Sequence, residues 1–139
     1  MSINTIKDVE FGQELEPFTP DTALTNTKAF ADAVNYSGNG RFEDHEKAKA
    51  QGLPGALVPG IMGMAFLTSM IQRWSAAATI EKIDTVFRAP MLADQPLTIS
   101  AVVTDMDEDD GLVELDLSIK NAADETRVFG TASVRLPTA

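Results

Sequence analysis

Apolar and polar residues alternate along the second half of the chain, and this pattern predicts antiparallel strands. Four segments combine β-branched residues with partial alternation: residues 80–88, 97–105, 112–120 and 127–136. In the third segment, Val113, Leu115, Leu117 and Ile119 alternate with polar residues, so we expect one face on a core and the other in water. Polar, turn-forming stretches at 107–111 and 121–125 favour consecutive hairpins.

Helical periodicity is confined to the first half of the chain. Residues 25–35 and 43–51 predict two short helices, the first capped by Thr25 or Thr27 and the second ended by Gly52. The longest apolar segment, 61–74, has apolar residues around most of its circumference. It predicts a long helix that is buried on nearly all sides.

These elements predict an α+β fold in which an antiparallel sheet is wrapped around one long central helix. The length of 139 residues suits one domain, residues 1–139, with one core. Apolar residues make up 44% of the chain and charged residues 23%, which is ordinary globular usage.

Composition narrows the partners and the chemistry. The net charge of −10 disfavours nucleic acid and anionic membranes. The absence of cysteine removes thiolate nucleophiles and thiolate metal ligands. The acidic run 105–110 lacks the spacing of a calcium loop, so we expect neither a metal nor a cofactor. No basic and apolar leader and no apolar run of about 20 residues is visible, so a cytoplasmic location is the expectation.

Four local sequences carry a family resemblance. The stretches Tyr36-Ser37-Gly38-Asn39, 44–55 and 58–62 resemble the hydratase segment of MaoC-like dehydratases, also called (R)-specific enoyl-CoA hydratases. The later stretch 83–91, followed by Asp94, is similar to the strand that follows the central helix in that family. The resemblance covers the chain from about Tyr36 onward and implies the hotdog fold.

The family resemblance implies a reaction and an acid–base pair. These enzymes add water across an α,β-unsaturated acyl thioester, using an Asp and a His five residues later. Without gaps, the Asp position falls on Ser37 and the His position on Phe42; with a two-residue deletion the Asp position falls on Asn39. None of these side chains is an acid or base near neutral pH.

Other positions of the family motif are retained. Gly60 matches the glycine whose amide holds the thioester oxygen, which suits the N-terminal end of a helix. Thr68 matches a hydroxyl used near the reacting centre, and Pro59 replaces the usual histidine before the glycine. Pro59 and Ile61, which flank Gly60, are expected at the substrate. CoA phosphates would need a local positive charge from Arg41, Lys47, Lys49 or Arg88, and of these Arg88 is the substrate-binding candidate.

His45 is the only histidine and could form a displaced acid–base unit with its neighbour Asp44. Adjacent helical residues point in different directions, which argues against a shared substrate. For His45 the alternative is an ordinary surface histidine, and for Asp44 it is a helix-capping residue. Both alternatives are favoured over the acid–base unit.

Two functions therefore remain open. The first is an enoyl-CoA hydratase or 3-hydroxyacyl-CoA dehydratase, and the second is a non-catalytic hotdog subunit that binds acyl-CoA or completes the dimer of a catalytic partner. Both predict an acyl-CoA thioester as ligand and a homodimer, a higher homo-oligomer or a heterodimer. A thioesterase ranks last, because hotdog thioesterases usually carry an acid on the central helix and residues 61–74 hold none.

Overall fold

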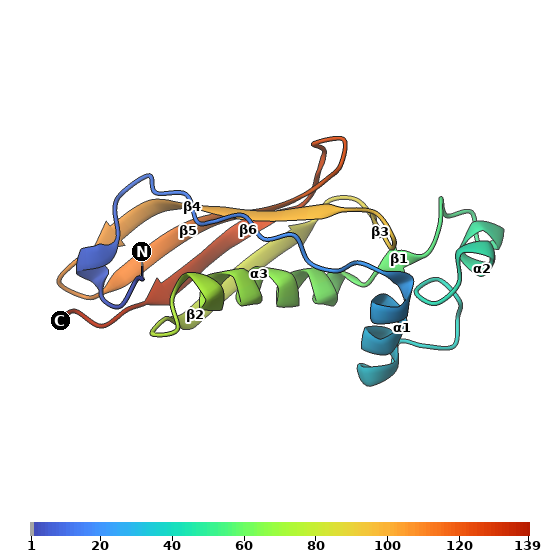
Figure 1. Ribbon diagram of the computed structural model, residues 1–139, viewed down its shortest axis with the longest axis horizontal. Helices are drawn as coiled ribbons and strands as arrows, with labels where there is room; N and C mark the ends of the chain where they lie inside the picture. Colours follow the sequence, from blue (N-terminus) through green and yellow to red (C-terminus); the bar gives the residue numbers. More distant parts are fainter. Residues whose placement is uncertain (1) are drawn as a thin grey trace.

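One antiparallel sheet and one long helix make up most of the molecule (Figure 1). The computed structural model describes residues 2–139. The sheet has the strand order β2–β6–β5–β4. Its strands are β2 (Thr79–Phe87), β4 (Leu97–Asp107), β5 (Leu112–Asn121) and β6 (Thr126–Arg135). Helix α3 (Gly60–Trp74) lies against one face of this sheet, so the predicted α+β arrangement is confirmed.

The core lies between α3 and the inward face of the sheet. On β5, Val113, Leu115, Leu117 and Ile119 are all buried, which confirms the alternation predicted from the sequence. They belong to one apolar cluster with the buried side chains of α3, namely Met62, Phe66, Leu67, Met70 and Ile71. Removing this apolar surface from water is the main force that fixes the helix on the sheet.

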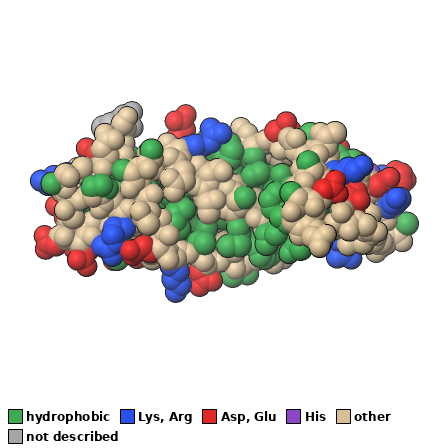
Figure 2. Space-filling view, turned by 90° about the horizontal axis from the view of Figure 1, so that it is seen from below, with side chains coloured by type: hydrophobic (Ala, Val, Ile, Leu, Met, Phe, Trp, Pro, Cys, Tyr) green, Lys and Arg blue, Asp and Glu red, His purple; other side chains and the backbone are tan. Residues whose placement is uncertain are grey.

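Helix α3 is buried on one side only, so the prediction of burial on nearly all sides is wrong. Ile61 is 37% exposed, and Ala65 and Ser69 are also exposed. The sheet covers only the opposite side of the helix. Seen from the helix side, apolar side chains gather across the middle of the surface (Figure 2).

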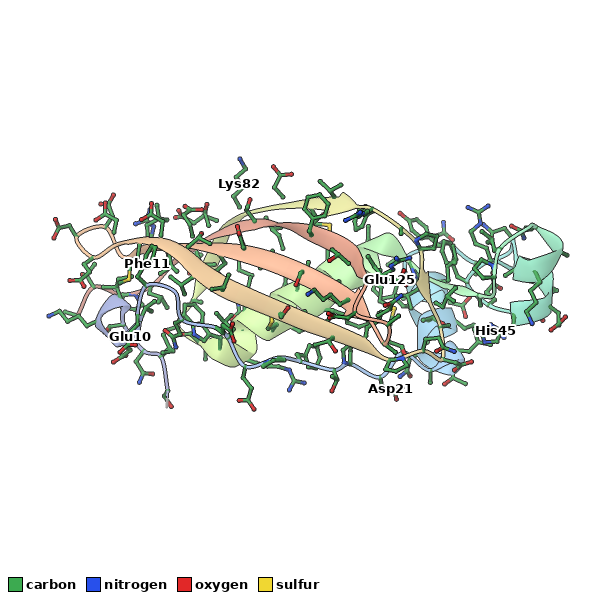
Figure 3. All side chains as sticks on the ribbon, turned by 90° about the horizontal axis from the view of Figure 1, so that it is seen from above. Glu10, Phe11, Asp21, His45, Lys82 and Glu125 are labelled. Carbon is green, nitrogen blue, oxygen red and sulfur yellow. The ribbon has the colours of Figure 1, made fainter. Side chains whose placement is uncertain are left out.

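The two edges of the sheet differ. Residues 12–18 run along β4, where the N–H of Leu15 donates to Ala101 O and Phe18 exchanges hydrogen bonds with Ile99. This segment follows a short 3₁₀ helix, η1 (Ile6–Asp8), and lies beside β4 in both views (Figures 1 and 3). Strand β2 has no such cover among residues 2–139, so its edge is open.

The remaining elements gather at one end of the molecule. They are α1 (Leu24–Ala33), α2 (His45–Ala50), β1 (Leu57–Val58) and β3 (Met91–Leu92), of which the two strands form a small antiparallel sheet. The predicted cap of the first helix by Thr25 or Thr27 is wrong, because Ala23 is the N-cap residue. Instead the N–H of Leu24 donates to Asp94 Oδ1 at 2.9 Å, so a residue distant in sequence caps this helix.

Candidate active site

The N-terminal end of α3 presents free backbone donors. Gly60 is the first residue of the helix and follows Pro59, which has no side chain able to cap it. The N–H groups of Met62 and Gly63 both donate to Pro59 O, whereas those of Gly60 and Ile61 find no acceptor among residues 2–139. Free N–H groups and the helix dipole make this end suited to polarise a carbonyl oxygen.

A cavity of about 360 Å³ lies beside Gly60. Its walls are apolar except for Arg88, and comprise Phe42, Leu57, Val58, Phe87, Ala89, Pro90, Met91 and Val128. A Cβ at Gly60 would lie 3.4 Å from the ring of Phe87, so the backbone of α3 and this ring are close together. These walls suit an apolar group next to the N-terminal end of α3.

The acid–base positions implied by the resemblance carry no titratable side chain here. Phe42, at the expected histidine position, lines the cavity beside Gly60 and stacks on Tyr36 with ring centroids 6.0 Å apart. Ser37 and Asn39 lie in the exposed loop that precedes Phe42, and neither lines this cavity. The structure therefore brings Phe42, but neither candidate for the aspartate position, to Gly60.

His45 is held by two groups of the protein. Its Nδ1 accepts from the N–H of Ala56 at 3.0 Å, which places the proton on Nε2, and Nε2 lies 2.7 Å from Asp94 Oδ2. This pairing holds the pKa of Asp94 below its ordinary value, chiefly through the His45 hydrogen bond and then through the N–H of Leu24. Because both ring nitrogens are engaged, His45 in this arrangement has no nitrogen left for substrate.

Asp44 acts as a helix cap. Its Oδ1 accepts from the N–H of Lys47 at 3.0 Å, and this hydrogen bond is the main cause of a lowered pKa at Asp44. The capping alternative is thus confirmed. The side chain is committed to α2 and does not line the cavity at Gly60.

Thr68 and Arg88 differ in their relation to the cavity at Gly60. Thr68 Oγ1 donates to Ala65 O at 2.9 Å and lies eight residues along α3, about 12 Å by the helical rise. The guanidinium of Arg88 is exposed at the cavity, and no ion pair joins it to another residue within 2–139. Of these two candidates, only Arg88 lines the cavity.

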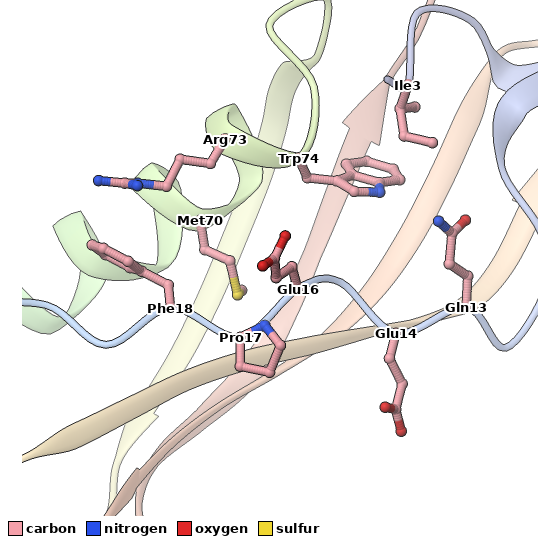
Figure 4. Close-up of a pocket in the computed structure, with 9 residues that line it drawn as sticks. All are labelled: Ile3, Gln13, Glu14, Glu16, Pro17, Phe18, Met70, Arg73 and Trp74. Atoms are coloured by element: carbon pink, nitrogen blue, oxygen red, sulfur yellow. The ribbon is translucent and has the colours of Figure 1, made fainter. Parts of the chain in front are cut away.

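A second cavity, of about 440 Å³, lies at the opposite end of α3 (Figure 4). There Arg73 lies 4.3 Å over the ring of Phe18, and Glu16 projects between Met70 and Trp74. The indole N–H of Trp74 is buried without an acceptor among residues 2–139. This cavity is about 20 Å from Gly60 along the helix, so it is separate from the candidate thioester site.

Residues 2–139 contain no group of three or more His, Asp or Glu side chains placed to hold a metal ion. No helix within the same residues combines the length and apolar character of a membrane span.

Sequence reasoning gave no site role to three residues near this end of the molecule, Phe87, Asp94 and Arg127. Asp94 belongs to a turn after β3 and pairs with His45 across 49 residues. Phe87 and Arg127 come from strands that look ordinary in sequence. Only the positive φ of Asp94, 64°, marks it as unusual, and that is a property of the folded backbone.

Comparison with known proteins supports the fold. No protein-family model and no curated protein matches the sequence. Among solved structures, the R-hydratase PhaJ1 from Pseudomonas aeruginosa has a TM-score of 0.87 at 19% identity, covering 96% of this chain and 85% of that one. The (R)-hydratase from A. caviae involved in PHA biosynthesis has a TM-score of 0.86 at 20% identity, covering 94% and 99%.

A chain of the ChsH1–ChsH2 complex from Mycobacterium tuberculosis has a TM-score of 0.82 at 22% identity, covering 92% of this chain and 98% of that one. Structures described as MaoC-like dehydratases also match. The chain therefore has the hotdog fold of MaoC-like dehydratases and (R)-hydratases, as the resemblance implied. At these identities the likeness concerns the fold alone.

Proposed function

We propose that this chain is the acyl-thioester-binding subunit of a hydratase or dehydratase assembled from hotdog chains. Gly60 holds the thioester oxygen, and a second hotdog chain supplies the acid–base residues. One observation carries the proposal: the cavity at Gly60 offers free backbone donors but no acid or base.

The binding half of the proposal follows from the end of α3. An acyl thioester has a polarisable carbonyl oxygen and an apolar tail. The free N–H groups of Gly60 and Ile61 suit the oxygen, and the apolar walls suit the tail. Arg88 is exposed and lines the cavity, and its positive charge would attract the phosphates of a CoA or phosphopantetheine carrier.

The catalytic half of the reaction needs residues that this cavity lacks. Adding water to an enone requires a base to activate the water and an acid to protonate carbon, and each such group typically contributes about 10²- to 10⁴-fold in rate. The His position is occupied by Phe42, and His45 is engaged by Ala56 and Asp94. Without a partner, the chain should bind the thioester and leave it unchanged.

The open edge of β2 supplies a place for the partner. Val86 and Phe87 on this strand are 50% and 49% exposed, which is unusual for large apolar side chains on a sheet. Phe87 also lines the cavity, so a chain that covers β2 would lie against the Gly60 site. The similarity to a chain of the ChsH1–ChsH2 complex, which contains two different subunits by name, supports this arrangement.

The test uses two substitutions at one position. Gly60→Pro removes the N–H while keeping a residue that suits the first position of a helix. Gly60→Ala keeps the N–H and adds the same Cβ. We expect the purified chain to bind crotonyl-CoA in calorimetry without loss of enone absorbance. Gly60→Pro should weaken binding about tenfold or more, and Gly60→Ala should not.

Equal binding by the two variants would contradict the role of the Gly60 amide. Hydration of crotonyl-CoA by the purified chain alone would contradict the subunit proposal. If the purified chain hydrated crotonyl-CoA and His45→Gln abolished that activity, the chain would be a hydratase that works alone with His45 in a displaced acid–base group.

A further inference from the structure

A third cavity, of about 350 Å³, lies between β3 and the hairpin that joins β5 to β6. Most of its wall is apolar and comes from Pro54, Pro90, Met91, Leu92 and Leu97. The polar side chains of the lining are Gln95, Asn121, Glu125 and Arg127, and Arg127 is the only cation among them. The cavity therefore combines an aliphatic surface with one cation, Arg127, and one carboxylate, Glu125.

The guanidinium of Arg127 is shielded and incompletely paired. Its side chain is 22% exposed, and its Nε is buried without an acceptor among residues 2–139. The nearest carboxylate is Glu125, whose Oε1 lies 3.6 Å from the Arg127 Nη2, and that oxygen also accepts from Asn121 Nδ2 at 2.9 Å. Because Glu125 is 3.6 Å away and shared with Asn121, the partly exposed guanidinium is left able to bind a second carboxylate.

This cavity adjoins the one at Gly60. Pro90 and Met91 line both of them, so the two cavities share part of their wall. Met91 extends to α3, where its Cε would lie 2.9 Å from a Cβ at Gly63. Because methionine is flexible and fills irregular gaps, it can move aside for an acyl chain that passes from Gly60 toward Arg127.

We propose that the cavity at Arg127 binds the free carboxylate of a dicarboxylic acyl group. The inference rests on the proposed function, because the thioester oxygen of that acyl group lies at Gly60. The substrate class is then an acyl thioester with a second carboxylate at the far end of a short aliphatic chain. Arg127 selects it over the uncharged acyl group of the same length.

The first experiment tests the carboxylate site without a thioester. The Nε–H signal of Arg127 is assigned by nuclear magnetic resonance through its loss in Arg127→Met, and the protein is titrated with hexanoate and with hexanol. Hexanoate should shift this signal and hexanol should leave it in place. Failure of hexanoate to shift it would overturn the inference.

The second experiment compares adipyl-CoA with hexanoyl-CoA, which differ only at the far end of the acyl chain. We expect wild-type protein to bind adipyl-CoA about tenfold or more tightly, because the carboxylate gains a charged hydrogen-bond partner. Arg127→Met should abolish this preference, and Arg127→Lys should retain part of it. Lys120→Met is the matched control, since it removes a cation from the same hairpin outside the cavity lining.

Equal weakening of adipyl-CoA, hexanoyl-CoA and free CoA by Arg127→Met would overturn the inference, because Arg127 would then contact a CoA phosphate. A hexanoate shift in a chain that binds neither acyl-CoA would refute the proposed function and leave the carboxylate site standing. Circular dichroism and the urea midpoint of each variant establish that it folds.

Discussion

His45 and Asp94 join segments that are far apart in the sequence. His45 opens α2, accepts from the N–H of Ala56 before β1, and donates to Asp94 after β3; Asp94 in turn accepts from the N–H of Leu24 at the start of α1. Ala56 is fully buried. These two side chains therefore hold the short helices to the loop that leads into α3.

We expect His45→Ala to destabilise the fold, because it leaves the buried N–H of Ala56 without an acceptor. A lost partner of this kind costs about 1–3 kcal/mol in the free energy of unfolding. Urea denaturation measures the effect, with Glu46→Ala as control, since Glu46 is an exposed neighbour whose pairing with Lys49 is on the surface. An unchanged urea midpoint in His45→Ala would contradict the structural role.

The loss of stability at low pH gives a prediction for Asp94. Its pKa is lowered in the fold from an ordinary value of 3.8, first by His45 and then by Leu24. A lowered pKa means that the ionised carboxylate stabilises the fold above the unfolded pKa and that this contribution disappears as pH falls through the folded pKa. The stability difference between wild type and Asp94→Asn should therefore shrink as pH falls below 3.8. A stability difference between the two proteins that grows as pH falls would refute the stabilising role of the ionised Asp94.

Local sequence could not identify this pair. His45 stands between Asp44 and Glu46, so reasoning from neighbours offers the wrong carboxylates. Its true partner is 49 residues away and meets it only after β3 has paired with β1. By contrast, the cap at Asp44 was predictable, because an N-cap bond spans only three residues.

At the scale of elements, the four long strands were predicted within two residues of their observed bounds, because inward and outward positions alternate in sequence, whereas the two-residue strands β1 and β3 were not predicted. On β5 this alternation is visible directly in Val113, Leu115, Leu117 and Ile119. The exposed side of α3 could not be predicted, because apolar residues occupy both sides of that helix. The pairing of residues 12–18 with β4 was also not predicted, because a segment that pairs with one edge of a sheet needs no regular spacing of apolar residues.

Two glycines, Gly63 and Gly130, lie at close contacts between elements and differ in how well they would tolerate an added Cβ. A Cβ at Gly63 on α3 would meet the ends of flexible side chains, Met91 Cε at 2.9 Å and Ile119 Cδ1 at 3.3 Å. A Cβ at Gly130 on β6 would overlap the backbone carbonyl of Asp84 and approach Thr85 Cα at 2.9 Å. The first contact can relax by side-chain movement, and the second requires β2 to move.

We therefore expect Gly63→Ala to change the free energy of unfolding by less than about 1 kcal/mol, because gained helix propensity offsets the crowding. Gly130→Ala should destabilise by about 2 kcal/mol or more, because overpacking falls on backbone atoms. Urea denaturation of the two variants side by side measures both effects. Equal stability of the two would show that β2 adapts easily.

At the scale of the whole molecule, the sheet has one covered edge and one open edge. Residues 12–18 cover β4, whereas β2 presents unpaired backbone groups together with Val86, which is half exposed. Two copies of β2 aligned antiparallel about Ile83 would place Lys82 of one opposite the partner's Asp84, so the edge is complementary to itself in charge. An exposed strand of this kind favours pairing with another chain.

In the absence of a catalytic chain, we expect the purified protein to form dimers through β2. Val86→Lys should raise the dissociation constant about tenfold or more, because a lysine at a buried interface loses its hydration without a partner. Sedimentation velocity over a range of concentrations measures the change. Phe11→Lys is the control, because Phe11 is 73% exposed on the loop beside β4, away from the open edge. A wild-type monomer, or equal effects of the two lysines, would refute assembly through β2, and with it the route by which a second chain reaches the cavity at Gly60.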